Sequence, residues 1–220
     1  MAWAGMDIQS HTYSHPFLTR TNFKPDDPRY LTWLDRELKD SKRVLEEHLK
    51  TNVNLLAYSY GWFNNIVETK AIEAGYQGIF TVNWGVNRFD ENPLRLKRRA
   101  VSNRLSLAEL KRYITSKPLS LNIISPSDAS IVSGVPEIRF TLNNRELVLT
   151  DMVAGRNKGV LKPDSEGVFR ADLKSAFPGY NTVIISGYDD DHQLWIGSWG
   201  FDYEPDKGSE HPGTPVVKAK

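Results

Sequence analysis

The chain has 220 residues, of which 40% are hydrophobic and 25% charged, shares that are typical of a folded globular protein. Its formal net charge of +1 provides no field that would gather nucleic acid or an anionic membrane. No apolar stretch approaches the roughly 20 residues of a membrane-spanning helix, and the opening residues MAWAGMD lack the features of a signal peptide. The chain contains no cysteine, so disulfides, a catalytic thiol and thiolate metal sites are excluded.

The first informative stretch is DIQSHTYSHPFL at 7–18, a short extended run that ends in two histidines, His11 and His15. Neutral imidazole is a good ligand for Zn²⁺, and a spacing of four residues lets two rings converge from one turn or compact loop. The alternative is that the neighbouring Ser and Thr side chains build turns and the histidines are simply hydrogen-bonded. On the residues alone, both interpretations stay open.

Helix and strand patterns alternate over the next hundred residues. In chain order they are a helix with leucines at helical spacing over 30–49, a strand VNLLAY at 53–58, a helix over 65–74, a strand GIFTVNW at 78–84 and a helix LAELKRYI opened by a Ser106–Glu109 capping box. Such alternation predicts βα units around a parallel sheet.

After residue 117 the pattern becomes all-β. The strand candidates, separated by turn-forming stretches, are PEIRFTL, GVFRADL, NTVIISGY and LWIGSWGFDY. They predict a small immunoglobulin-like sandwich over 118–205, after a first domain at 1–117 and before a polar, disordered tail at 206–220.

Two features of the second domain allow a functional interpretation. YDDDH at 188–192 is either a calcium loop or a charged turn, and the turn is favoured because ligand-spaced partners are not evident. The aromatic residues of the last strand alternate with period two, which favours a buried core face over a sugar-binding platform. They are Trp195, Trp199, Phe201 and Tyr203.

Four segments, in order, resemble a known family. AGMDIQSHTYSHP is similar to the second motif of the polysaccharide deacetylases (NodB homology, carbohydrate esterase family 4), whose SHTxSH segment supplies two metal-binding histidines. The third motif of the family resembles LLAYSYGWFN. The helix end and the following strand, which carries a pocket aromatic in the family, resemble AIEAGYQGIFTVNWGVN. The late strand of the family, which ends in an arginine-containing run, resembles NPLRLKRRAVS. The resemblance covers about residues 2–115.

The resemblance implies a distorted (β/α) barrel that removes acetyl groups from N-acetylglucosamine-containing polymers with the help of a divalent metal, most often zinc. By motif matching, His11 and His15 are the histidine ligands of that metal. The backbone amide of Tyr60 lies where the family stabilises the oxyanion, and Trp62 and Trp84 are the expected substrate-binding aromatics. Members of the family are usually exported or attached to the cell surface.

The sequence also departs from the family. The Thr-Phe-Asp-Asp motif, which supplies the metal Asp and the catalytic base, is absent. Asp7 is a poor substitute, because an extended chain places it about 13 Å from His11. Ser59 stands where the third motif usually has Pro, and no late His matches the general acid, since His48, His192 and His211 fall on a helix, a turn and the tail.

About 115 residues are too few to close a barrel of this kind, whose usual length is roughly 250 residues or somewhat less. The sequence therefore predicts either a fragment of a longer protein or a gap filled by a second chain or swapped element. Two functions follow: a metal-dependent polysaccharide deacetylase, with this chain as a truncated form, or a non-catalytic relative that binds or helps to assemble a glycan. An unrelated hydrolase with histidine ligands is a weaker third possibility.

Overall fold

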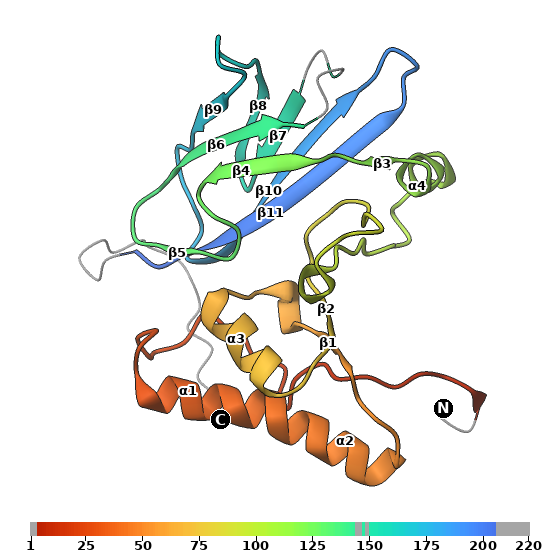
Figure 1. The fold of residues 1–220 in the computed structure, drawn as a ribbon, viewed down its shortest axis with the longest axis vertical. Coiled ribbons are helices and arrows are strands. Elements are labelled where there is room, and N and C mark those ends of the chain that lie inside the picture. The colour runs from red at the N-terminus through yellow and green to blue at the C-terminus, as the bar shows by residue number, and fades with distance from the viewer. Residues whose placement is uncertain (1–3, 144–146, 148–149, 206–220) are drawn as a thin grey trace.

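The computed structural model describes residues 4–143, 147 and 150–205, so the predicted tail at 206–220 lies outside the described residues. Figure 1 shows an α/β unit formed by the first part of the chain and a β-sandwich formed by the second. The predicted fold class, a partial deacetylase-type α/β barrel followed by a sandwich, is confirmed. The predicted domain boundaries stay a prediction. Within the described residues, no helix has the length and apolarity to cross a membrane.

The α/β unit contains a short parallel sheet with extended segments at both edges. Strand β1 (Leu55–Ala57) pairs in parallel with β2 (Gly78–Phe80), Ser10 forms a parallel bridge to β1, and Leu96 forms one to β2. The helical elements around this sheet are α1 (Pro28–Asp35), η2 (Arg36–Asp40), α2 (Ser41–Leu49), η3 (Ser59–Gly61), α3 (Asn65–Glu73), η4 (Pro93–Arg95) and α4 (Leu107–Ile114).

Helices α1, α3 and α4 each begin after a side chain that caps their first backbone amides. Asp27 caps α1 ahead of Pro28, the Asn64 side chain accepts two amide hydrogens at the start of α3, and the predicted capping box opens α4. Leucines of the first helical stretch and apolar residues of β1, β2 and α3 form one core, with Leu34, Leu38, Leu56, Val67 and Ile79 fully buried.

The helix predicted over 30–49 runs as α1, η2 and α2, with η2 a π-helical segment. A π segment rotates the side chains that follow it relative to a regular α-helix. Here it carries Glu37, a buried carboxylate on the side that faces the histidine segment. The leucine spacing of the sequence does not reveal this interruption.

The sandwich consists of a six-stranded and a three-stranded sheet. The first has the order β3-β11-β10-β7-β8 with β5 beside β11, and the second has the order β4-β6-β9. The strands are β3 (Lys117–Pro118), β4 (Leu121–Ser125), β5 (Ile131–Val132), β6 (Glu137–Leu142), β7 (Thr150–Ala154), β8 (Asn157–Leu161), β9 (Phe169–Asp172), β10 (Gly179–Tyr188) and β11 (Leu194–Tyr203).

Strand β11 borders both units. Trp199 and Phe201 are fully buried in the core between the two sheets, as the alternation predicts. On the opposite face, Ser198 donates to the carbonyl of Trp84, and Asp202 accepts from the Asn64 amide at 2.9 Å. Nine of the ten β11 residues are buried, so the strand has no solvent face.

An ion-pair network also joins the units. Arg95 of η4 donates to Glu68 of α3 and, at 3.0 Å, to Asp128, whose other oxygen accepts the amide of Gly200 at 3.0 Å. Tyr180 of β10 lies in the core of the α/β unit and donates to the Asn83 amide oxygen at 3.0 Å. The sandwich therefore packs against the carboxyl ends of β1 and β2.

Candidate functional site

The histidine segment is fixed to the edge of the parallel sheet. The Ser10 amide donates to the Leu55 carbonyl at 3.1 Å, and the Ala57 amide donates to the Ser10 carbonyl at 3.0 Å. His11 therefore follows directly after an extended segment that pairs with β1. Carboxyl ends of parallel strands are where α/β folds place their sites.

The two imidazoles converge. The Nε2 atoms of His11 and His15 lie 3.1 Å apart, and His11 Nδ1 lies 2.6 Å from the Ala57 carbonyl oxygen. Because a carbonyl only accepts, Nδ1 of His11 carries the hydrogen and its Nε2 presents a lone pair. This orientation by a backbone carbonyl is typical of metal-binding histidines.

Backbone strain gathers at the same place. Thr12, His15 and Tyr60 all have positive φ angles, at 70°, 58° and 57°, which are uncommon for residues other than glycine. The His15 conformation is held by its amide, which donates to Thr12 Oγ1 at 3.1 Å. Such strained residues cluster at functional sites because surrounding contacts must enforce them.

Glu37, which the sequence analysis missed, anchors the histidine segment. Its carboxylate accepts from the amides of Tyr13 and Ser14 at 3.1 and 2.8 Å and from the Ser14 hydroxyl at 2.7 Å. Only 2% of Glu37 is exposed. A charged residue three positions after Leu34, among the leucines of a predicted helix, was the signal available in the sequence.

The turn after β1 carries the predicted Tyr60. Its neighbour Ser59 is fully buried and donates its hydroxyl to the Pro16 carbonyl, which ties the turn to the histidine segment. The Arg98 guanidinium donates to the Thr81 carbonyl at 2.8 Å and to the Tyr58 carbonyl, just before the turn, at 3.5 Å. Burial raises the pKa of the Tyr58 phenol well above its usual value, so the turn rests on a neutral side chain.

Aromatic rings extend from the histidines. The ring of Tyr60 lies 4.7 Å from that of His15 and stacks on Phe17 at 3.9 Å, and Phe17 lies 4.6 Å from Trp62. Phe17 is an addition to the predicted set, and only its place beside the HP dipeptide hinted at it. We call His15, Tyr60, Phe17 and Trp62 the aromatic row.

Trp84, the other predicted aromatic, lies away from this row. Its ring stacks under the Arg99 guanidinium, with 3.4 Å from the guanidinium carbon to the ring centre, and Arg99 also covers Tyr113 of α4 at 3.9 Å. No contact within the described residues joins Trp84 to the histidines. Trp84 instead faces β10 and β11 of the sandwich.

The histidine pair fits two positions around a metal ion. With metal–nitrogen bonds of about 2.0–2.1 Å, two ligands lie about 2.9 Å apart at a right angle and about 3.4 Å apart in a tetrahedron. The observed 3.1 Å lies between these values. Within the described residues no group of three or more His, Cys, Asp or Glu side chains gathers, and Asp7 accepts a hydrogen bond from Gln9 instead. The third ligand is thus absent from the described part of the chain.

Comparison with protein families identifies the segment that contains the histidine pair. Residues 1–79 match the family model described as polysaccharide deacetylase. These residues are part of a polysaccharide deacetylase domain. The deacetylase segment contains His11, His15 and the Tyr60 turn, and the family consists of deacetylase hydrolases that act on polysaccharides.

Solved structures give more distant likenesses. The Streptococcus pyogenes deacetylase PplD in complex with acetate is 28% identical over 48% of this chain and 43% of its own, with a TM-score of 0.40. The de-N-acetylase from Aggregatibacter actinomycetemcomitans is 15% identical over 51% and 49%, with a TM-score of 0.43. The fibronectin(III)-like modules of Clostridium thermocellum CbhA are 15% identical over 40% of this chain and 100% of theirs, at 0.29.

The chain thus spans less than half the length of these two deacetylase structures. No curated protein matches it. The family assignment of the deacetylase segment rests on the family model and on the histidine motif within it.

Proposed function

We propose that this chain is part of a metal-dependent deacetylase that hydrolyses N-acetyl groups of an N-acetylglucosamine-containing polysaccharide. The observation that carries the proposal is the convergence of the His11 and His15 Nε2 atoms at 3.1 Å inside a polysaccharide deacetylase segment. We propose Zn²⁺ as the metal, because imidazole nitrogens suit it. When bound, such a metal lowers the pKa of a coordinated water and polarises an acyl oxygen.

The residues of this chain have separate tasks in the proposed reaction. The Ala57 carbonyl holds His11 in the tautomer that directs its Nε2 lone pair toward His15. The Tyr60 turn, fixed by Ser59 and Arg98, presents a backbone amide as a donor for the developing oxyanion. The exposed ring of Tyr60 and the neighbouring Phe17 and Trp62 offer flat apolar faces to a sugar.

We propose that the third ligand and the catalytic base come from polypeptide outside the described residues, either a further segment of the same protein or a second chain. The segment that ends at Ser10 pairs with β1, which leaves its other edge for such a partner. Because the substrate of the family is a polymeric glycan, we further propose an exported or surface-attached protein. Under this proposal the carboxylate that completes the metal site with His11 and His15 is supplied by that further polypeptide.

A second candidate function is glycan binding or assembly without catalysis. The observation that favours it is the lack of a third ligand among the described residues. In that case the aromatic row holds the sugar and the histidine pair serves as a hydrogen-bonding element. The two functions differ in whether the pair binds metal.

Metal binding tests the proposal directly. We expect the protein to bind Zn²⁺ in calorimetric titration at pH 7.5, with affinity at least about tenfold lower in His11→Ala and His15→Ala. His48→Ala is the matched control, because His48 is exposed on α2 and should leave the affinity unchanged. Equal Zn²⁺ affinity in all four proteins contradicts the metal site. Acetate release from an N-acetylglucosamine oligomer by a protein that includes the missing carboxylate tests catalysis.

A further inference from the structure

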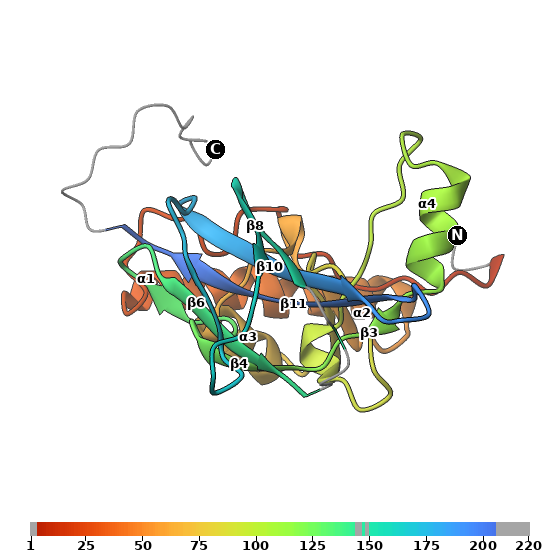
Figure 2. The ribbon, with the colours of Figure 1, turned by 90° about the horizontal axis from the view of Figure 1, so that it is seen from above.

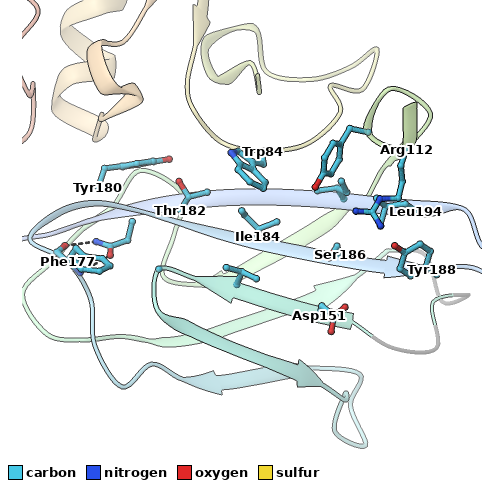
Figure 3. Close-up of a pocket in the computed structure, with 15 residues that line it drawn as sticks. Trp84, Arg112, Asp151, Phe177, Tyr180, Thr182, Ile184, Ser186, Tyr188 and Leu194 are labelled. Carbon is cyan, nitrogen blue, oxygen red and sulfur yellow. Dashed lines mark hydrogen bonds between the residues drawn. The ribbon is translucent and has the colours of Figure 1, made fainter. Parts of the chain in front are cut away.

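A groove lies outside the histidine site, on the outward face of the sandwich. It has a volume of about 480 Å³ and lies between strands β7, β10 and β11 on one side and the Trp84 loop and α4 on the other. Figure 3 shows Thr182, Ile184 and Ser186 following one another along β10 beneath Trp84. None of the predicted site residues except Trp84 lines it.

The floor of the groove combines hydroxyl and aliphatic groups. Thr182, Ile184 and Ser186 are half-buried on this face, whereas Val183 and Ile185, which alternate with them, are fully buried in the sandwich core. The floor is therefore not the packing face of the strand. It offers two hydroxyl groups four residues apart, those of Thr182 and Ser186, with the aliphatic side chain of Ile184 between them, and the Thr182 hydroxyl also donates to Asn83 at 3.2 Å.

The walls of the groove are aromatic and partly open to solvent. Trp84 is 41% exposed, Phe177 is 47% exposed and Tyr188 is 43% exposed, so the rings have free surface on a folded domain. Arg99 stacks between Trp84 and Tyr113 and holds that wall in place. Two of its guanidinium nitrogens are buried without a hydrogen-bond partner, so stacking is what positions it.

The charge of the groove is balanced. Its lining contains one cation, Arg112, and one anion, Asp151. Arg99 and Arg156 stack on aromatic rings of the walls instead of lining the groove, so the lining itself has no excess of positive charge for a polyanion or an acidic peptide. Flat rings, spaced hydroxyls and a near-neutral field match a neutral sugar chain, whose rings present C–H faces and whose edges present hydroxyl groups.

The groove begins next to the aromatic row. Trp62, the end of that row, packs so closely on Gly179 that a Cβ atom there would lie 2.3 Å from its ring. The following residue, Tyr180, lines the groove. The contact between Trp62 and Gly179 thus places the end of the aromatic row next to the groove.

We propose that this groove binds a neutral, N-acetylated oligosaccharide and holds further sugar units of the polymer that the deacetylase segment acts on. The inference rests on the proposed function for the identity of the sugar. The groove itself does not depend on the histidines or on a metal. It assigns the sandwich a role in substrate binding.

Nuclear magnetic resonance titration with an N-acetylglucosamine hexamer tests the inference. We expect shifts at the amides of residues 151–155 and 182–186, and at least fivefold weaker binding in Phe177→Ala and Ser186→Arg. Phe89→Ala is the matched control, because Phe89 is a fully exposed aromatic residue outside the groove. His11→Ala should retain the shifts in the groove.

The outcomes separate the two proposals. Loss of Zn²⁺ binding in His11→Ala with groove shifts retained supports both, and groove shifts in a protein that binds no Zn²⁺ support the groove alone. The groove proposal is overturned if the hexamer shifts no groove amides, or if both groove variants bind it as the wild type does. A circular dichroism melt of each variant checks that it is folded.

Discussion

At the scale of single residues, the candidate site depends on a few side chains that act on the backbone of others. Glu37 fixes the amides of the histidine segment, and the Ala57 carbonyl fixes the His11 ring. The strained φ angles of Thr12 and His15 lie in the segment that Glu37 holds, and that of Tyr60 lies in the turn that Ser59 ties to Pro16. The site is therefore sensitive to residues that need not touch a substrate.

Replacement of Glu37 tests this dependence. In Glu37→Ala two partly buried amides lose their acceptor, and we expect the free energy of unfolding to fall by about 1–3 kcal/mol. We also expect weaker Zn²⁺ binding, because the histidine segment is no longer held. Urea denaturation and calorimetric titration measure the two effects.

Two further variants complete the Glu37 experiment. Glu37→Gln should recover most of the stability, since its amide oxygen can accept from both backbone amides. Glu47→Ala, at an exposed ion pair on α2, should change stability by less than about 0.5 kcal/mol. If Glu37→Ala is no more destabilised than Glu47→Ala, the anchoring role is wrong.

Gly61 limits the shape of the Tyr60 turn. Its φ of 72° is unfavourable for other residues, and an added Cβ would lie 2.3 Å from Val82. We expect Gly61→Ala to lower the midpoint of thermal unfolding more than Gly167→Ala, where φ is 80° but no atom lies within 4 Å. The double variant Gly61→Ala/Val82→Ala should recover part of the difference. Equal effects of Gly61→Ala and Gly167→Ala would show that the close approach to Val82 is unimportant.

At the scale of elements, the sequence predicted what local patterns determine. The capping box at Ser106, the helix at 65–74 and the strand pattern around the buried Trp199 are all present. The anchoring role of Glu37 on the π segment was not predictable, because its partners Tyr13 and Ser14 lie more than twenty residues away in the chain. The same holds for Phe17, whose role depends on the distant Tyr60 turn.

Helix α4 contains no buried residue. It projects beside the sandwich in Figure 2, and its apolar residues Leu107 and Ile114 are 82% and 73% exposed. Apart from the stacking of Tyr113 on Arg99, its stability therefore depends on its capping box. In this box Ser106 Oγ accepts from the Glu109 amide at 3.2 Å, and the Ser106 amide donates to the Glu109 carboxylate at 2.9 Å. The helix also carries Arg112 and Tyr113, which line the sandwich groove.

Loss of the cap should unfold α4 locally. We expect Ser106→Ala to cost about 1 kcal/mol in this helix and to raise the hydrogen-exchange rates of the amides at 107–114 by roughly fivefold. Global unfolding should change little, and hexamer binding in the groove should weaken. Ser133→Ala, at an exposed site after β5, is the control. Unchanged exchange at 107–114 in Ser106→Ala contradicts the prediction.

At the scale of the whole molecule, a buried carboxylate lies where the two units meet. Asp202 is fully buried on β11, and one of its oxygens has no hydrogen-bond partner while the other accepts from Asn64. Its pKa is raised to about 7, mainly by burial, which the Asn64 hydrogen bond opposes and the nearby charge of Glu204 reinforces. The folded protein thus keeps a proton that the unfolded chain releases near pH 4.

The pH dependence of stability follows from this proton. Because the pKa of Asp202 is higher in the folded state, its contribution is fully present below about pH 4 and is lost as the pH rises through about 7. We expect Asp202→Asn, which cannot ionise, to gain stability relative to the wild type between pH 4 and pH 8. Urea denaturation at several pH values measures the difference.

Asp191→Asn, in the exposed turn between β10 and β11, is the control for this series. Its stability should follow that of the wild type at each pH. A constant difference between Asp202→Asn and the wild type from pH 4 to pH 8 would show that Asp202 does not titrate in this range.

The arrangement of β11 has a consequence for how this protein can change over generations. Alternate positions of the strand face the sandwich core, whereas the others face the groove, the Trp84 loop, Asp128 or Asn64 of the α/β unit, and nine of the ten residues are buried. A substitution in β11 therefore disturbs the packing of one unit or the other, and hardly any position can change without a loss of stability. The sandwich and the deacetylase segment must accept substitutions together, so neither can be exchanged for a foreign domain without repacking its partner.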